Sequence, residues 1–369
     1  MSNVQRGAGM TAEFSEDDLE LEDDVEDEEV AISYDIASYP SDNTLSTLVD
    51  MWGRGDIKIP DFQREFVWSR KQSSLLIDSF LSGLPVPPIF FYIGDDNVNL
   101  VIDGQQRLLS IFFFFEGYFG AEDAHGNRPV FRLYGLGKKS PYRNKRYQDL
   151  DEADQRGLRS AVLRAINIRQ LGPANDDSSA YYIFERLNTG GTPLTGQEIR
   201  NVVYRGPFND TLKSLNADES WRAILGRPLP DKHQKDIELL LRVFSLVGTA
   251  DQYEKPLKKY LNDTMGKHRE GKSQKAEAFS KVFPLVTKMV VDQLGPKPFH
   301  LRRPLNVAAL DSVLSVLLEE HASVNPTSLG DRWNSLKSDA DFNEHTTRNT
   351  TDPKTVHLRI QDVRQRLLG

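Results

Sequence analysis

The sequence predicts an α+β protein, in which an N-terminal part that mixes strands with helices is followed by an all-helical part. Short apolar runs bounded by turn residues, such as 89–93 and 99–102, are typical of strands. After Val203, apolar residues recur at helical spacing over 236–246, 276–294, 305–321 and 356–367, with glycine and proline between them. We therefore expect a mixed domain over 43–205 and a helical domain over 206–369.

Length and composition limit the class of protein. With 369 residues and 38% hydrophobic content, the chain is long enough for two or three domains with cores of their own. It contains no cysteine, which excludes disulfides, thiolate metal sites and a cysteine nucleophile. Neither a secretory leader pattern nor an apolar run of about 20 residues is visible. We therefore expect a soluble, cytoplasmic protein with no membrane partner.

The charge is divided unevenly along the chain. Residues 1–30 contain twelve acidic side chains and a single base, Arg6. With three more aspartates before Arg54 and a formal net charge of −8, the remainder carries about +6. We expect residues 1–42 to form an acidic, disordered tail, either a solubilising segment or one that competes with nucleic acid for the basic body.

The segment from residue 44 to 93 contains several local sequence patterns that indicate helices and strands. Residues 44–52 are expected to be a short helix and 57–60 a strand entering a turn. A helix over 71–82 follows with Ser69 as its cap, and the prolines in 84–88 indicate an extended link to the strand at 89–93. Before that helix, Phe66 and Trp68 are interpreted as core anchors, whereas the polar pair Gln63 and Arg64 lies between apolar neighbours and either is buried or lines a cleft.

The segment 100–111, LVIDGQQRLLSI, is the strongest candidate for a site. An apolar strand delivers Asp103 and Gly104, and a helix opens with Gln105, Gln106 and Arg107. Glycine permits close approach of a ligand, the first amides of a helix are unpaired donors, and the dipole there favours an anion. Arg107 adds a planar fork suited to phosphate or carboxylate. An ordinary strand-to-helix turn with a surface arginine explains the local pattern equally well.

Two further stretches contain polar clusters. Basic residues at 138, 139, 143, 145 and 146 are interleaved with tyrosines at 134, 142 and 147, which suits either phosphate contacts or a solvated loop. A helix is expected over 149–165, and a strand over 164–169. An amphipathic helix over 179–187 ends in a loop where Gly190 and Gly191 expose amides within reach of Arg186 and Asn188. The next helix begins with Thr195 as cap and Glu198 in a capping box.

Taken together, these segments resemble a known family. Three motifs, in this order, resemble the N-terminal domain of GmrSD-type modification-dependent restriction enzymes. They are Gln63-Arg64 before Trp68, then Asp103-Gly104-Gln105-Gln106-Arg107, then 184–191 (FERLNTGG) with Leu194 and 198–200 (EIR). The resemblance covers about residues 45–205. It implies a ParB/sulfiredoxin-like fold and a role in bacterial anti-phage defence.

The resemblance also implies chemistry. The DGQQR motif would bind a nucleoside triphosphate and support its hydrolysis, coupled to the sensing or cleavage of foreign DNA. Asp103 would orient a metal-bound or attacking water and be the protein ligand to Mg²⁺. Gln105, Gln106 and Arg107 would hold phosphate oxygens. The remaining pocket residues would be Gln63, Arg64, Gly104, Arg186, Asn188, Gly190 and Gly191. No Walker lysine loop is present.

The sequence departs from those family members that continue into a His-Asn-His nuclease domain. Its seven histidines form no pair at metal-ligand spacing. The enzyme hypothesis is therefore a nucleoside triphosphatase that regulates a partner nuclease or another defence protein, with a homo-oligomer as a further option. Two alternatives stay open: a non-catalytic DNA- or nucleotide-binding sensor that recruits a separate nuclease, and a weak ParB-like DNA nuclease.

Overall fold

A computed structural model describes residues 35–59, 66–94, 96–120, 122, 126–172, 178–187, 194–301 and 304–368. The chain divides into two compact units, one ending at Tyr204 and the other beginning at Arg205. Residues 1–34, which hold most of the expected acidic tail, lie outside the described part.

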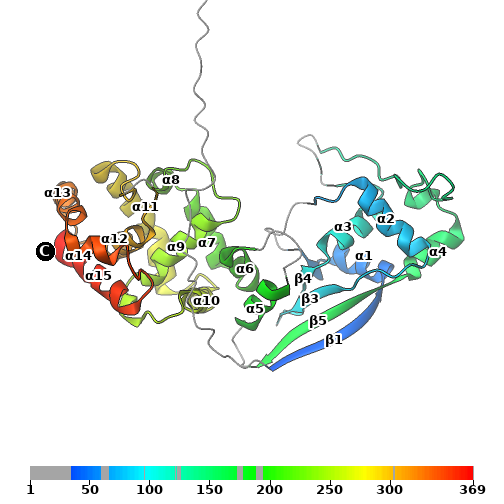
Figure 1. The fold of residues 1–369 in the computed structure, drawn as a ribbon, viewed down its shortest axis with the longest axis horizontal. Helices are drawn as coiled ribbons and strands as arrows, with labels where there is room; N and C mark the ends of the chain where they lie inside the picture. The colour runs from blue at the N-terminus through cyan, green and yellow to red at the C-terminus, as the bar shows by residue number, and fades with distance from the viewer. Residues whose placement is uncertain are drawn as a thin grey trace, which may run out of the picture. The chain divides into compact units, whose positions relative to one another are not determined.

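The first unit mixes strands and helices, and the described part of the second is built from helices (Figure 1), so the α+β prediction is confirmed. The first has the order β1 (Asp35–Thr44), α1 (Leu45–Arg54), β2 (Ile57–Lys58), α2 (Arg70–Leu81), β3 (Ile89–Ile93), β4 (Asn99–Asp103), α3 (Gln105–Glu116), η2 (Tyr147–Asp149), α4 (Glu152–Ser160), β5 (Val162–Gly172), α5 (Ser178–Leu187) and α6 (Gly196–Val203). The second has α7 (Pro207–Asn216), α8 (Glu219–Leu225), α9 (Lys235–Leu246), η3 (Ala250–Gln252), α10 (Leu257–His268), α11 (Gln274–Leu294), α12 (Val307–Glu319), α13 (Pro326–Lys337), α14 (Ala340–His345) and α15 (Pro353–Leu367).

The five strands form one mixed sheet in the order β1-β5-β3-β4-β2. Strands β1 and β5 are antiparallel, as are β3 and β4, whereas β3 runs parallel to β5 and β2 parallel to β4. Strand β4 therefore lies inside the sheet, between β3 and the two-residue edge strand β2. This position fixes the place where β4 ends and α3 begins.

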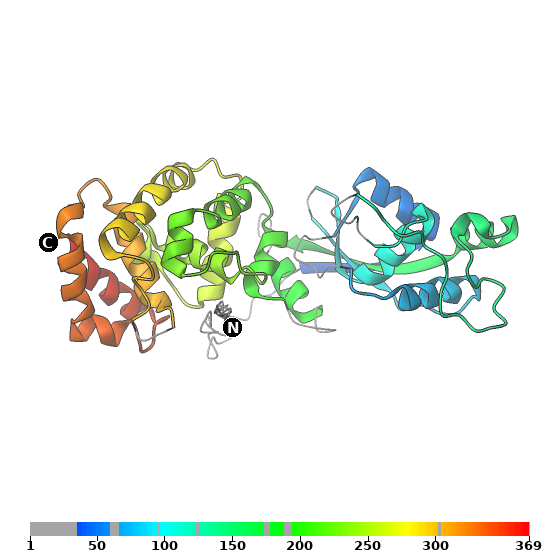
Figure 2. The same ribbon diagram turned by 90° about the horizontal axis from the view of Figure 1, so that it is seen from above.

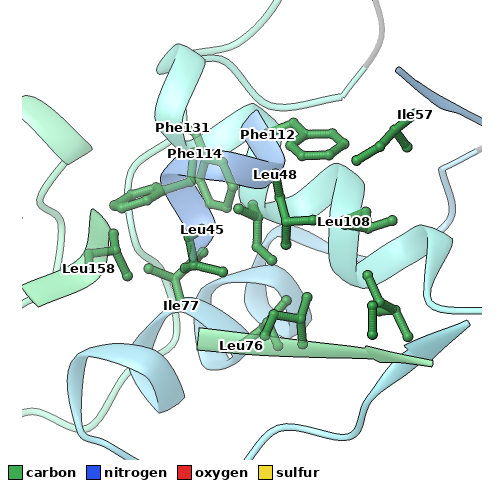
Figure 3. Close-up of a cluster of buried hydrophobic side chains, with 14 of the residues drawn as sticks. Leu45, Leu48, Ile57, Leu76, Ile77, Leu108, Phe112, Phe114, Phe131 and Leu158 are labelled. Carbon is green, nitrogen blue, oxygen red and sulfur yellow. The ribbon is translucent and has the colours of Figure 1, made fainter. Parts of the chain in front are cut away.

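The main core of this unit lies between one face of the sheet and helices α1, α2 and α3, which Figure 1 shows on the same side. Because side chains alternate along a strand, Ile89 and Phe91 of β3 and Val101 of β4 point into this core. The helices contribute a dense set of buried aliphatic and aromatic side chains (Figure 3), among them Leu45, Leu48, Leu76, Ile77, Leu108 and Phe112. Helix α3 is thus held along its length by the core.

The other face of the sheet is covered by α5. Tyr92, which alternates with Phe91 on β3, contacts Phe184 of α5 with ring centroids 6.5 Å apart. Buried Leu100 and Ile102 flank Val101 on β4 and point to the side opposite to it. The apolar spacing predicted for residues 179–187 therefore serves packing on the sheet.

Several local signals have the expected structural result. Ser69 caps α2 in a capping box with Gln72, and Thr195 caps α6 in a capping box with Glu198. Phe66 packs edge-on against Phe113 and Phe119, with ring centroids 4.9 and 5.4 Å apart, which confirms its predicted role as a core anchor.

Two boundaries differ from those expected. Residues 35–42, assigned to the acidic tail, form most of β1, because this segment pairs with β5 and its Asp42 forms an ion pair with Arg164 at 2.7 Å. The helix expected over 149–165 ends at Ser160, since Leu163 and Ala165 alternate into the core from strand β5. Both differences arise from the β1–β5 pairing, which joins residues more than a hundred positions apart.

The helical unit, coloured green to red along the chain in Figure 2, has α12 at its centre. Residues 308–318 of α12 are all buried, and the helix packs against α9, α11 and α15. Buried ion pairs cross this interior, including Arg222 with Asp236 at 2.8 Å and Arg359 with Asp311 at 3.1 Å. None of the helices formed by the described residues is both long enough and apolar enough to span a membrane.

Candidate functional site

The candidate site is the turn between β4 and α3, and its first residue is Asp103. Asp103 is the last residue of β4, where it pairs with Phe90 of β3. The side chain is 52% exposed. A carboxylate is thus presented to solvent at the end of a strand whose preceding residues are buried.

Gly104 makes the turn, and its backbone requires glycine. Its φ of +97° lies in the left-handed region that side-chain-bearing residues rarely adopt. A Cβ added there would lie 2.3 Å from Cγ2 of Ile89 on β3, far inside van der Waals contact. The glycine therefore serves two purposes, because it reverses the chain and lets α3 start directly against the sheet.

Arg107 lies in the first turn of α3 and reaches back to the strand. Its Nη2 donates to Oδ2 of Asp103 at 2.6 Å and to the carbonyl oxygen of Pro88 at 3.2 Å. The side chain is 17% exposed, and its Nε is buried without a hydrogen-bond partner among the described residues. The guanidinium is therefore fixed at the turn, and its Nε–H makes no hydrogen bond among the described residues.

The start of α3 has the features of an anion site. The helix has 12 residues, its cap Gly104 supplies no side-chain acceptor, and no acidic residue stands in its first turn. The amides of residues 105–107 lie in the first turn of the helix, where the helix dipole adds positive potential. Gln105, the first helical residue, is half-buried at this end.

Gln106 makes contacts that the sequence pattern did not reveal. Its side-chain Oε1 accepts hydrogen bonds from the backbone amides of Val67 and Trp68, at 3.0 and 3.1 Å. Its carbonyl oxygen accepts from Ser110, whose hydroxyl also bonds Ser73 of α2 at 2.8 Å. The side-chain oxygen is thus occupied by protein amides, and Gln106 positions the segment that enters α2.

The remaining sequence-predicted residues are not brought together by described contacts. Gln63, Arg64, Asn188, Gly190 and Gly191 lie outside the described residues. Arg186 is exposed in the last turn of α5. Among the described candidates, Asp103, Gly104 and Arg107 form one group.

A polar network on α6 was not predicted as a unit. Gln197 donates from Nε2 to Oδ1 of Asn201 at 2.9 Å and accepts from Nη1 of Arg200 at 3.3 Å. The Arg200 guanidinium lies 5.6 Å from the centre of the Tyr181 ring. Its local signal, three polar residues at helical spacing after a capping box, is common to many surface helices, and only the tertiary structure identifies the network.

No cluster of three or more metal-ligating side chains occurs among the described residues. His345, one of the seven histidines, pairs with Asp362 at 2.7 Å. At the β4–α3 turn the described carboxylate is Asp103. This donor set fits a Mg²⁺ that takes most of its ligands from phosphates and water, because such ions use one or two carboxylates, and it does not fit an all-protein metal cage.

A cavity of about 380 Å³ lies within the helical unit, between α9, α10, α12 and α15. Its walls combine leucines, valines and tyrosines with four threonines, and its charged groups already have partners: Arg242 pairs with Glu238 at 2.8 Å and Arg359 with Asp311 at 3.1 Å. The charged side chains that line this cavity therefore already have ion-pair partners.

The fold and the turn define a mixed domain of strands and helices that presents an arginine where an internal strand ends and a helix begins. Residues 45–205 match the family model of the GmrSD restriction endonuclease N-terminal domain, and this part of the chain is a domain of that family. A second similarity is to an uncharacterized protein of Methanocaldococcus jannaschii, 36% identical over 100 residues, which covers 21% of this chain and 17% of that protein. The chain thus spans about a sixth of that relative.

Proposed function

We propose that the β4–α3 turn binds the phosphates of a nucleoside triphosphate. The observation that carries the proposal is Arg107, held at the N-terminus of α3 with a buried Nε that has no partner among the described residues. A fixed guanidinium at the N-terminus of a helix, where the helix dipole favours an anion, is suited to phosphate oxygens. Gly104 lets α3 start directly against β3 and so sets the position from which Arg107 reaches the turn.

In this proposal the residues of the turn have separate roles. Arg107 binds phosphate and stabilises negative charge that develops during transfer. Asp103 orients the attacking water or a Mg²⁺ carried in with the nucleotide, which would supply charge neutralisation when bound. Gln105 faces the phosphates from the first turn, while Gln106 holds residues 67 and 68 and so fixes the segment that enters α2.

The family of residues 45–205 extends the proposal to a biological role. Its name denotes a restriction endonuclease, and we propose that this chain acts in restriction-type anti-phage defence, with contact to DNA. Nucleotide turnover would then regulate DNA sensing or cleavage, with the cutting supplied by a partner nuclease.

One observation favours a second candidate, a sensor that binds nucleotide without turnover. Oδ2 of Asp103, the carboxylate oxygen closest to Arg107, is engaged in an ion pair with it at 2.6 Å. A carboxylate that forms this ion pair serves to orient the arginine. The two candidates differ in what loss of Asp103 does to binding and to turnover.

The test is phosphate release from each of the four ribonucleoside triphosphates with magnesium, with and without duplex DNA. An Asp103→Ala variant should lose turnover by at least about 100-fold while still binding nucleotide, because a group that acts mainly in the transition state contributes little to ground-state binding. Asp42→Ala is a matched control, because Asp42 is also an arginine-paired aspartate, 51% exposed against 52% for Asp103. Nucleotide binding without turnover in the wild type would establish the sensor instead.

A further inference from the structure

A second cationic feature of the first unit lies in the segment after α3. Residues 134–146, which we call the basic loop, have the sequence YGLGKKSPYRNKR. They contain five lysines and arginines and no acidic residue. This density of one sign of charge is unusual for a short connection and marks the loop for an anionic partner.

The basic loop is anchored at both ends and in its middle. The amide of Leu133 donates to the carbonyl of Lys145 at 3.0 Å, and the amide of Asn144 donates to the carbonyl of Leu133 at 2.8 Å. The amide of Tyr134 donates to Oγ of Ser74 on α2 at 2.8 Å, and Leu136 is buried in the core. The loop therefore presents its cations from a supported backbone.

The first residues of α2 add to the same surface. The guanidinium of Arg70 lies 4.9 Å from the centre of the Tyr134 ring, a cation–π contact. The side-chain stem of Lys71 packs against Gly135, where an added Cβ would lie 2.7 Å from Cγ of Lys71. Arg70 and Lys71 are both exposed and thus extend the cationic surface beyond the loop itself.

One cation of the basic loop has an ion-pair partner, because Arg146 pairs with Asp149 at 2.7 Å. Burial, together with the charges of Asp154, Asp151 and Asp78, raises the pKa of Tyr142 in the same loop. The other cations have no carboxylate within ion-pair distance among the described residues: Arg70, Lys71, Lys138, Lys139, Arg143 and Lys145. Six cations on one loop and the helix beside it thus lack an ion-pair partner among the described residues, so an extended anion that contacts several of them would be attracted.

We infer that the basic loop, with Arg70 and Lys71, binds the phosphate backbone of duplex DNA without reading its sequence. The inference rests on the DNA contact in the proposed function and gives that contact a location. Exposed lysines and arginines spread over a supported loop match phosphates repeated along a duplex, and cation–phosphate contacts of this kind carry affinity without sequence information. The surface is distinct in residues from the β4–α3 turn, so the two are separable by mutation.

The experiment measures the affinity of the full chain for a labelled 20-base-pair duplex, by fluorescence anisotropy, over a range of salt concentrations. The test variant is the triple change Lys138→Gln, Lys139→Gln and Arg143→Gln. The control variant, Lys272→Gln, Lys281→Gln and Arg348→Gln, removes the same charge from exposed positions of the helical unit. Urea unfolding of each variant establishes that it is folded.

For the test variant we expect the negative slope of log K against log salt to become shallower by about 2.7, which corresponds to three lost phosphate contacts. The affinity at 0.1 M salt should fall about 100-fold or more. The control should keep the slope and affinity of the wild type.

Equal behaviour of the two variants would overturn the location while leaving DNA binding, and the proposed function, in place. Tighter binding of an RNA duplex of equal length would assign the surface to RNA. Absence of any duplex binding by the wild type would remove both the location and the DNA part of the proposed function, and phosphate release would still test the nucleotide part.

Discussion

Gly104→Ala tests how the turn is built. The substitution places a Cβ 2.3 Å from Cγ2 and 2.9 Å from Cβ of Ile89, at a φ of +97°. The left-handed backbone costs about 1–2 kcal/mol for alanine, and overpacking against β3 costs about 1–3 kcal/mol more. We therefore expect the free energy of unfolding of the first unit to fall by about 3 kcal/mol, which is a large share of the stability of an ordinary domain.

A matched control separates the two contributions. Gly55, the residue after α1, also has a positive φ, +78°, but nothing lies within 4 Å of an added Cβ. Gly55→Ala should therefore cost only the backbone part, about 1–2 kcal/mol. Hydrogen exchange of the amides of β3 and β4 measures the opening free energy of this unit without a contribution from the helical one.

A double variant provides the refuting result. Ile89→Ala removes Cγ2, so it should be less destabilising in the Gly104→Ala background than in the wild type, with a coupling of about 1 kcal/mol or more. If Gly104→Ala costs no more than Gly55→Ala, or if the two substitutions at 89 and 104 are additive, the close approach of α3 to β3 is not what requires glycine.

Three further predictions concern other contacts. Gln106→Ala leaves the amides of Val67 and Trp68 without their acceptor, so it should cost about 1–3 kcal/mol and speed hydrogen exchange at these two amides before others. Asp311→Ala leaves Arg359 buried without its carboxylate and should cost about 3–5 kcal/mol in urea unfolding, whereas Asp42→Ala, at an exposed pair, should cost less than about 1 kcal/mol. Burial, with Lys275 and Lys267 nearby, lowers the pKa of His268 to about 4 from 6.5, so the unfolded chain binds the extra proton between these values and stability falls as pH falls through this range. His268→Gln should remove that part of the acid sensitivity, seen as a flatter dependence of the urea midpoint on pH.

Local chemistry made much of the fold predictable from the sequence. The capping boxes at Ser69 and Thr195 mark helix starts by hydrogen bonds that span three residues, and Gly104 marks the turn because its conformation excludes other residues. The long apolar periodicity after residue 206 likewise needs only neighbouring turns of a helix to be recognised.

What the sequence did not reveal depends on contacts between distant segments. Residues 35–42 look like part of an acidic tail until β5 supplies Arg164 and a pairing edge. Gln106 looks like a ligand residue until the amides of Val67 and Trp68, 39 and 38 positions away, are placed on its side-chain oxygen. Asp103 and Arg107 belong to one predicted turn, but neither the ion pair between them nor the hydrogen bond from Arg107 to Pro88 was predicted.

The most direct test of the central proposal is calorimetric titration of the four ribonucleoside triphosphates, with magnesium, into the wild type and Arg107→Gln. Arg164→Gln is the control, because Arg164 also pairs with a half-exposed aspartate of the same unit. We predict that the wild type binds at least one triphosphate and the control retains that affinity. Arg107→Gln should lose it by about 10–100-fold, the effect of a charged hydrogen bond worth about 1.5–3 kcal/mol. Equal affinities of Arg107→Gln and the control, or no binding by the wild type, would contradict a phosphate site at the β4–α3 turn.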